Sequence, residues 1–253
     1  MPTFASFDGI ELYYDDQGDG RPVVLLHGFA ADTNINFVRS GILDALVDEG
    51  YRTIALDHRG HGLSSKPHEP EAYADDALTR DAQALFDHLG LDRVTVVGYS
   101  MGSGLALRLA AIDPRVVAVV ALGVGAASIE RGAEEGAQDG SGMGDAMLAD
   151  DPDSITDPLG RQFRTLADSI RADRLALAAL MQAGRPRPAD HLGDIRVPVL
   201  VVAGADDELA GDPQGLADRI DGARAVTVPG DHFTANARAV DAIVDFLADA
   251  ARR

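Results

Sequence analysis

The chain has 253 residues, of which 46% are hydrophobic and 25% charged, and its formal net charge is −19. This length is enough to bury a core without disulfide bonds or a structural metal. The chain has no cysteine, which excludes disulfide bonds, thiolate catalysis and cysteine-based metal sites. Because 41 acidic residues outnumber 22 basic ones, a nucleic-acid partner is not expected.

The start of the chain and its apolar runs bear on location. Residues 1–9 lack the basic and then apolar pattern of a secretion signal, and no apolar run approaches the roughly 20 residues of a membrane span. We therefore expect a cytoplasmic protein with no membrane partner. The oligomeric state stays open.

Short runs rich in Val, Leu and Ile alternate with longer helical stretches. Residues 3–7 and 10–14 read as a small hairpin with its turn at Asp8-Gly9. Further strands are predicted over residues 22–27, 52–57, 94–98, 116–122, 197–203 and 225–228. Most of them lack polar alternation, which is typical of strands buried on both faces of a parallel sheet.

Two helices between or after these strands are predicted from the spacing of apolar residues and from capping residues. Apolar residues at three- and four-residue spacing predict a helix over residues 72–89, ended by Gly90. Asn236 is predicted to be the N-cap of a last helix with an inward stripe at Val240, Ile243, Val244 and Leu247. The alternation predicts an α/β fold: a doubly wound, mostly parallel sheet opened by an antiparallel hairpin.

The stretch between Gly123 and Arg196 interrupts this alternation. It carries helical patterns near residues 143–148, 159–170 and 175–181 but no convincing strand, and it is too long for a simple connection. We expect residues 1–123 and 197–253 to form the core domain and residues 124–196 a helical lid or cap insertion. Its apolar face either favours an apolar acyl group in the pocket or simply packs the cap onto the core. Its arginines either hold a carboxylate or form a solvated helix face; they are Arg161, Arg164, Arg171 and Arg174.

The central motif is Gly98-Tyr99-Ser100-Met101-Gly102, which directly follows a predicted strand and opens a helix. A serine hydroxyl is a poor nucleophile unless it is exposed, held in place and next to a base. A tight strand-to-helix turn exposes it, and the strained backbone requires residues without side chains nearby, hence the two glycines. The motif therefore predicts that Ser100 is a nucleophile.

Four motifs in order, over essentially the whole chain, resemble the α/β-hydrolase superfamily, in particular its small lidded serine hydrolases. Besides the serine turn, Leu26-His27-Gly28-Phe29 resembles the family's third strand and His-Gly turn, and residues 57–64 resemble its Asp-x-Arg-Gly-x-Gly-x-Ser loop. Residues 197–204 look like the strand before the catalytic acid, and Gly230-Asp231-His232 resembles the segment with the catalytic histidine. The resemblance implies the α/β-hydrolase fold with a nucleophile elbow and a catalytic triad.

The base and the acid follow from the needs of the serine. His232, in a turn after a late strand, is the best candidate for the base. His27, by comparison, is expected to be hydrogen-bonded in its own loop, and His58 and His61 are expected to order theirs. An acid must hold the tautomer of the base. The family register favours Asp207 over Asp206, with Glu208 third.

An acyl transfer also needs donors for the oxyanion. Backbone amides suit this role because they need no reorganisation during the reaction. The resemblance and the helix that follows Ser100 indicate the amides of Phe29 and Met101 as the oxyanion hole. The side chains of Phe29, Met101 and Phe233 are expected to line the substrate pocket, although Phe29 and Met101 could equally be plain core.

The sequence thus predicts a serine hydrolase that cleaves a carboxylic ester or lactone, with no cofactor and no metal. Perhydrolase or cofactor-free haloperoxidase chemistry and C–C bond hydrolysis remain open on the same triad. Relatives that open epoxides have aspartate in place of Ser100, and cyanohydrin-cleaving relatives use a lysine, whereas Lys66, the only lysine, lies in the wrong loop. From another class, a ligand-binding sensor on a hydrolase scaffold is the alternative.

Overall fold

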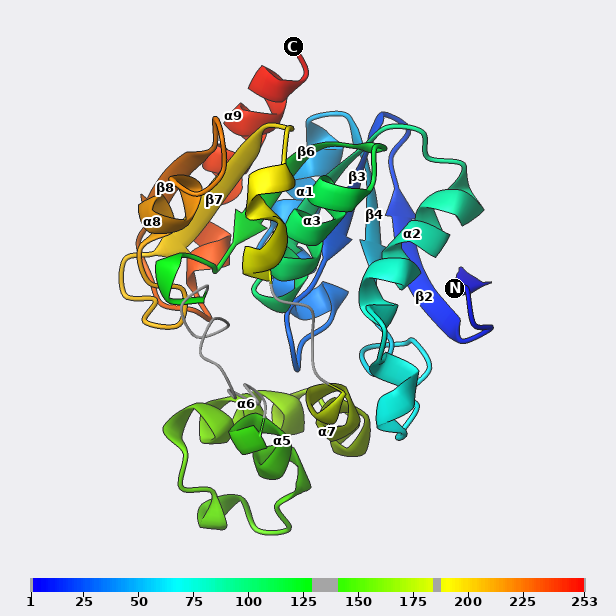
Figure 1. Ribbon diagram of the computed structural model, residues 1–253, viewed down its shortest axis with the longest axis vertical. Helices are drawn as coiled ribbons and strands as arrows, with labels where there is room; N and C mark the ends of the chain where they lie inside the picture. Colours follow the sequence, from blue (N-terminus) through cyan, green and yellow to red (C-terminus); the bar gives the residue numbers. More distant parts are fainter. Residues whose placement is uncertain (1, 129–140, 184–187, 253) are drawn as a thin grey trace.

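The computed structural model describes residues 2–128, 141–183 and 188–252, so parts of the predicted cap insertion lie outside it. One sheet of eight strands runs through the core in the order β1-β2-β4-β3-β5-β6-β7-β8 (Figure 1). The strands are β1 (Thr3–Ala5), β2 (Glu11–Gln17), β3 (Arg21–Leu26), β4 (Tyr51–Leu56), β5 (Val94–Tyr99), β6 (Val116–Leu122), β7 (Val199–Gly204) and β8 (Arg224–Val228).

The first strands of the sheet differ in direction from the rest. β1 pairs with β2 and β2 with β4 in antiparallel register. The remaining pairs, along the order β4-β3-β5-β6-β7-β8, are all parallel. The predicted hairpin is present, with Gly9 at φ 84° in its turn. The predicted fold class is therefore confirmed.

Apolar side chains of the central strands point alternately to two hydrophobic layers. Val24 and Leu26 of β3 pack in one layer, whereas Val23 and Leu25 pack in the other, and all four are fully buried. The first layer is covered by α2 (Ala77–Leu89), α3 (Met101–Ile112) and α8 (Pro213–Ala217), and residues of the helices between β6 and β7 join the same cluster. Two helices cover the second: α1 (Ile42–Asp48) and α9 (Val240–Ala250). Burial on both faces explains why these strands lack polar alternation.

Two helix starts differ from their prediction. α2 begins at Ala77 instead of residue 72, because Asp75 and Asp76 have φ of 51° and 62° and separate it from the 3-10 helix η2 (Pro70–Tyr73). The prediction that Asn236 caps the last helix was wrong. Asn236 lies in the 3-10 helix η5 (Ala235–Arg238), and the residue before α9 is Ala239.

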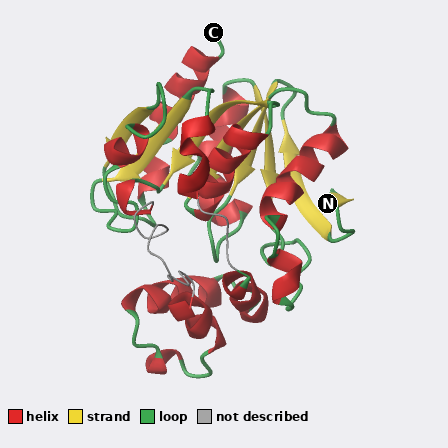
Figure 2. Ribbon diagram, viewed as in Figure 1, coloured by secondary structure: helices red, strands yellow, loops and turns green. Residues whose placement is uncertain are grey.

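Between β6 and β7, the described residues form a helical body that lies apart from the sheet (Figures 1 and 2). Its elements are α5 (Ser141–Leu148), the 3-10 helix η3 (Pro152–Ser154), α6 (Pro158–Ser169) and α7 (Arg174–Gln182). The 3-10 helix η4 (Pro188–Asp194) then packs against α3. We refer to α5, α6 and α7 as the cap helices.

Two arginines bind the cap helices to one another. The nearly buried Arg164 of α6 donates to the carbonyl oxygens of Ala146 and Ala149 at 2.9 and 2.7 Å. Arg174 of α7 donates to the carbonyls of Met147 and Ala149, both at 3.2 Å. These cations therefore satisfy carbonyl groups at the end of α5, which otherwise have no partner in the helix.

Candidate active site

Ser100 occupies a sharp turn between β5 and α3. Its backbone has φ 51° and ψ −111°, an uncommon conformation for a residue with a side chain. Its amide donates to the carbonyl of Leu122 at 2.7 Å, which fixes the turn to the neighbouring strand β6. The side chain is partly exposed at the carboxyl edge of the sheet.

The two glycines of the motif are required by close backbone contacts. A Cβ at Gly98 would lie 2.2 Å from the carbonyl oxygen of Gly102, and a Cβ at Gly102 would lie 1.9 Å from that of Leu26. Both values are far below a van der Waals contact, and the atoms met are backbone atoms that cannot swing away. The steric reason for the glycines thus lies in the packing of α3 against the ends of β3 and β5.

The structure brings Ser100, His232 and Asp207 together from three loops. The Nε2 atom of His232 lies 3.0 Å from the Oγ atom of Ser100, and its Nδ1 atom lies 2.9 Å from a carboxylate oxygen of Asp207. Asp207 is buried and also accepts from the amide of Ala210 at 2.9 Å. Its neighbours Asp206 and Glu208 are exposed.

Tyr99 contacts the segment that carries His232. Its hydroxyl donates to the carbonyl oxygen of His232, and the two rings lie 5.7 Å apart. Burial, with the nearby charges of Asp207 and Asp231, raises the pKa of Tyr99 well above its ordinary value. The phenol therefore stays protonated and keeps donating to the histidine segment.

Phe29 lines the same cavity as Ser100, and Met101 follows Ser100 in the chain. Within the described part of the chain, neither amide donates to an acceptor, although both residues are buried. Met101 begins α3, where amide groups lack intrahelical partners and the helix dipole favours a negative charge. Both amides are thus available to a ligand oxygen.

Three buried histidines lie in the loops beside Phe29. His27 Nδ1 lies 2.8 Å from the carbonyl of Gly28, and its Nε2 accepts from the amide of His58 at 3.0 Å. His61 Nε2 accepts from the amide of Ala30 at 3.3 Å. Accepting at Nε2 requires a neutral ring, and burial lowers the pKa of His27 and, more strongly, that of His58. The expected loop-ordering role is thus confirmed for His27 and His61, whereas neither ring nitrogen of His58 has a partner among the described residues.

A cavity of about 100 Å³ opens at Ser100 and His232. Aromatic and aliphatic side chains provide most of its walls, and two of them, Phe163 and Leu166, come from α6 of the cap. The lining residues are Gly28, Phe29, Ala31, Ile35, Asn36, Tyr99, Ser100, Phe163, Leu166, His232, Phe233 and Asn236. Phe29 and Phe233, both predicted pocket residues, lie here, whereas Met101 is not among the lining residues and packs in the core.

The ring of Phe163 joins the cap to the core. It lies 5.7 Å from the ring of Phe29 and 5.8 Å from that of Phe233, in both cases edge to face. Such aromatic pairs contribute about 0.5–1.5 kcal/mol each beyond their buried area. Phe163 therefore closes the cavity as a third aromatic wall.

Two lining residues, Ile35 and Asn36, were not predicted from the sequence; they lie on the π-helix η1 (Asn34–Val38). The available signal was a buried-looking Ile-Asn-Phe run shortly after the His-Gly turn. A polar residue between two apolar ones does not by itself reveal which cavity it faces.

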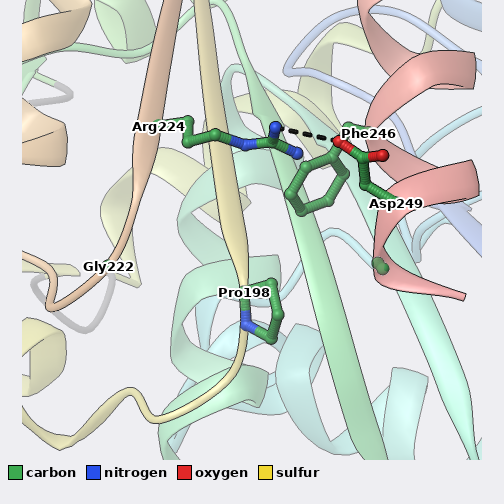
Figure 3. Close-up of a pocket in the computed structure, with 6 residues that line it drawn as sticks. Pro198, Gly222, Arg224, Phe246 and Asp249 are labelled. Atoms are coloured by element: carbon green, nitrogen blue, oxygen red, sulfur yellow. Dashed lines mark hydrogen bonds and ion pairs between the residues drawn. The ribbon is translucent and has the colours of Figure 1, made fainter. Parts of the chain in front are cut away.

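A second hollow of about 20 Å³ lies elsewhere on the core, between β8 and α9 (Figure 3). Arg224 and Asp249 form an ion pair there at 3.1 Å, beside Phe246 and Pro198. Its volume is little more than one water needs, and its lining carboxylate, Asp249, is paired with Arg224. The cavity at Ser100 is therefore the candidate site.

Comparisons with known proteins agree with this architecture. Residues 21–186, more than half of the chain, match the α/β hydrolase fold family. A non-heme chloroperoxidase of Kitasatospora aureofaciens is 41% identical over 104 residues, which are 41% of this chain and 36% of that protein. The chain thus spans only about a third of the length of this curated relative. 

Two solved structures are similar over almost their whole length. The enol-lactonase from Burkholderia xenovorans is 26% identical with a TM-score of 0.73, and the match covers 100% of both chains. The bromoperoxidase from Bacillus anthracis is 25% identical with a TM-score of 0.76, and the match covers 98% of this chain and 100% of that one. In the described residues, no helix has the length and apolar character needed to cross a membrane. Because the family model matches more than half of its residues, the chain belongs to the α/β hydrolase fold family.

Proposed function

We propose that this chain is a serine hydrolase that cleaves a carboxylic ester or a lactone through an acyl-enzyme intermediate. The observation that carries the proposal is the relay from Ser100 Oγ to His232 Nε2, 3.0 Å, and from His232 Nδ1 to Asp207, 2.9 Å. A nucleophile next to a base that is itself oriented by a carboxylate is the arrangement that acyl transfer needs.

Each residue has a defined part in the reaction. Ser100 Oγ attacks the carbonyl carbon while His232 Nε2 takes its proton, and Asp207 stabilises the imidazolium through Nδ1–H. The amides of Phe29 and Met101 hold the oxyanion of the tetrahedral intermediate. His232 then gives its proton to the leaving alkoxide, and a water activated by the same histidine releases the acid.

The cap and the walls of the cavity suit an apolar acyl group. Phe29, Phe163 and Phe233 line the cavity beside the serine and offer an apolar surface to such a group. In this proposal residues 124–196 act as a cap over the core and supply part of the acyl pocket through α6.

The test compares the wild-type protein with Ser100→Ala. The wild type is expected to turn over p-nitrophenyl esters many times and to be labelled covalently by a fluorophosphonate. The variant is expected to lose activity by a factor on the order of 10⁶ and to take no label, because no other group supplies the nucleophile. A wild type that takes no label contradicts the assignment of Ser100. A wild type that is labelled but releases product only once favours the sensor alternative.

A second candidate, perhydrolase or cofactor-free haloperoxidase chemistry, is favoured by the similarity to a chloroperoxidase and a bromoperoxidase. Here hydrogen peroxide replaces water in attacking the acyl-enzyme, which yields a peracid and free Ser100; the peracid oxidises halide and is reduced to the carboxylic acid. Bromination that requires acetate, peroxide and Ser100 distinguishes this reaction from simple hydrolysis. C–C bond hydrolysis uses the same triad and is tested with a vinylogous diketone.

A further inference from the structure

Asn36 links the loop that carries the Phe29 amide to the segment that carries His232. Its Oδ1 atom accepts from the amide of Gly28 at 2.7 Å, directly before Phe29. Its backbone carbonyl accepts from Nδ2 of Asn236 at 3.0 Å, four residues after His232. One buried residue therefore holds two parts of the proposed machinery at a fixed spacing.

The orientation of the Asn36 amide follows from these bonds. Because Oδ1 accepts from the Gly28 amide, Nδ2 is the free end of the side chain. Within the described part of the chain, Nδ2 has no acceptor, and it is not among the enclosed polar atoms that lack a partner. Asn36 lines the cavity at Ser100, so we expect an acceptor for Nδ2 to come from this cavity.

The other polar side chains around the cavity are already engaged. Both ends of the Asn236 amide are used, by the carbonyl of Asn36 and by the amide of Ala237. The Tyr99 hydroxyl donates to His232, and Ser100 pairs with the same histidine. Most other walls are apolar. A nearly buried donor that stays unpaired costs free energy, which a substrate oxygen at this position would recover.

We propose that Asn36 is a positioning and specificity-determining residue. Its Oδ1 holds the Gly28–Phe29 peptide so that the Phe29 amide faces the oxyanion, and its Nδ2 donates to an acceptor oxygen on the acyl group. This inference rests on the proposed function. It narrows the substrates to esters or lactones whose acyl part carries an ether, hydroxyl or keto oxygen besides the scissile carbonyl.

The experiment uses two esters whose acyl groups have the same number of heavy atoms: p-nitrophenyl methoxyacetate and p-nitrophenyl butyrate. The selectivity is the ratio of their kcat/KM values, corrected by their rates with hydroxide. The variants are Asn36→Leu, which loses both polar atoms, and Asn36→Asp, which keeps an acceptor for Gly28 but loses the donor. Asn34→Leu is the matched control, because Asn34 lies on the same helix but is exposed.

Both Asn36 variants are expected to lower the selectivity for methoxyacetate about tenfold, the equivalent of one hydrogen bond. For butyrate, which lacks the extra oxygen, Asn36→Leu should lower kcat about tenfold. The kcat of Asn36→Asp should be at least threefold higher than that of Asn36→Leu. The control should change neither quantity. If Asn36→Leu does not fold by circular dichroism, the selectivity of Asn36→Asp decides.

Selectivity that stays unchanged in the Asn36 variants, or that falls equally in Asn34→Leu, overturns the specificity role. Equal kcat values for butyrate in the wild type and Asn36→Leu overturn the positioning role. Failure of the proposed function is distinguishable, since the wild type would then hydrolyse neither ester and take no fluorophosphonate label at Ser100.

Discussion

The carboxyl edge of the sheet and the cap helices meet at the same cavity but are held in different ways. At the sheet edge, buried polar side chains such as Asp207, His232 and His27 are fixed by hydrogen bonds of 2.8–3.0 Å. The cap contacts the core through apolar side chains such as Phe163 and Leu166, which line the cavity, and through an exposed contact between His68 and Asp173. Directional bonds fix positions sharply, whereas ring contacts permit sliding. We therefore expect the sheet edge to set the rate of the chemistry and the cap to set the ranking of substrates.

Among substitutions that leave the serine in place, the largest expected effect comes from Asp207→Asn. The amide keeps the shape of the carboxylate but does not stabilise the imidazolium and favours the wrong tautomer of His232, so kcat should fall about 10⁴-fold for every ester. Steady-state kinetics with acetate and butyrate esters measure it. Asp206→Asn is the matched control, because that neighbouring carboxylate is exposed, and it should change kcat less than twofold. Equal losses in the two variants would contradict the role of Asp207.

The sequence predicted much of this edge and little of the cap side of the cavity. The motif of Gly98, Ser100 and Gly102 could be recognised in the sequence because the tight turn leaves no room for a Cβ at either glycine. The choice of Asp207 over its exposed neighbours is supported by its burial in the structure. Asn36 was not readable, because its importance arises from bonds to segments 8 and 200 residues away. The approach of Phe163 to Phe29 likewise depends on how two separate bodies pack.

Buried neutral histidines should make the sheet edge sensitive to acid. His58 is fully buried, and both of its ring nitrogens lack a partner among the described residues. Desolvation, followed by the neighbouring His27 and His61, lowers its pKa well below 6.5. Below about pH 6.5 the unfolded chain therefore binds a proton that the folded chain does not, so stability is full above this pH and falls below it.

His58→Leu tests this dependence. Relative to the wild type, the free energy of unfolding of the variant should rise by up to about 1.4 kcal/mol for each pH unit below 6.5. Urea denaturation at pH 7.5, 6.5 and 5.5 measures the free energy of unfolding of both proteins. Titratable groups that both proteins share cancel when the wild-type value is subtracted from that of the variant. His191→Leu, at a partly exposed position, serves as the control. Parallel pH profiles for the wild type and His58→Leu would show that His58 carries no such penalty.

Phe163→Ala probes the cap side of the comparison. The variant loses two edge-to-face contacts and one wall of the cavity, so kcat/KM for p-nitrophenyl butyrate should fall about tenfold, mainly through KM. For the smaller acetate ester the change should stay below twofold. Phe163→Leu keeps an apolar wall, so its kcat/KM for butyrate should lie between those of the wild type and Phe163→Ala. A uniform loss of kcat for both esters would mean that the cap helps to set the chemistry, and the division proposed above would fail.

The smallest effect is expected from His68→Gln, which removes the imidazole that contacts Asp173 between the core and the cap, an ion pair only when His68 is protonated. His68 Nε2 lies 3.0 Å from Asp173, and their side chains are 46% and 31% exposed, so solvent screens the pair. Burial alone would raise the pKa of Asp173, but hydrogen bonds from His68 and from the first amides of α7 outweigh it and leave this pKa below its ordinary value. Asp173 therefore contributes its stability above about pH 3.9 and loses it as the pH falls through its lower folded pKa.

At neutral pH the substitution should lower the free energy of unfolding by about 0.5 kcal/mol or less in 20 mM salt, and the difference should vanish in roughly 0.5 M salt. His191→Gln is the control, since His191 pairs with Asp194 within η4 and joins no cap helix to the core. Urea denaturation and butyrate kinetics measure both variants. If His68→Gln alone changed the butyrate-to-acetate ratio, this exposed pair would hold the cap in register, and the ring of Phe163 would not be sufficient to place it.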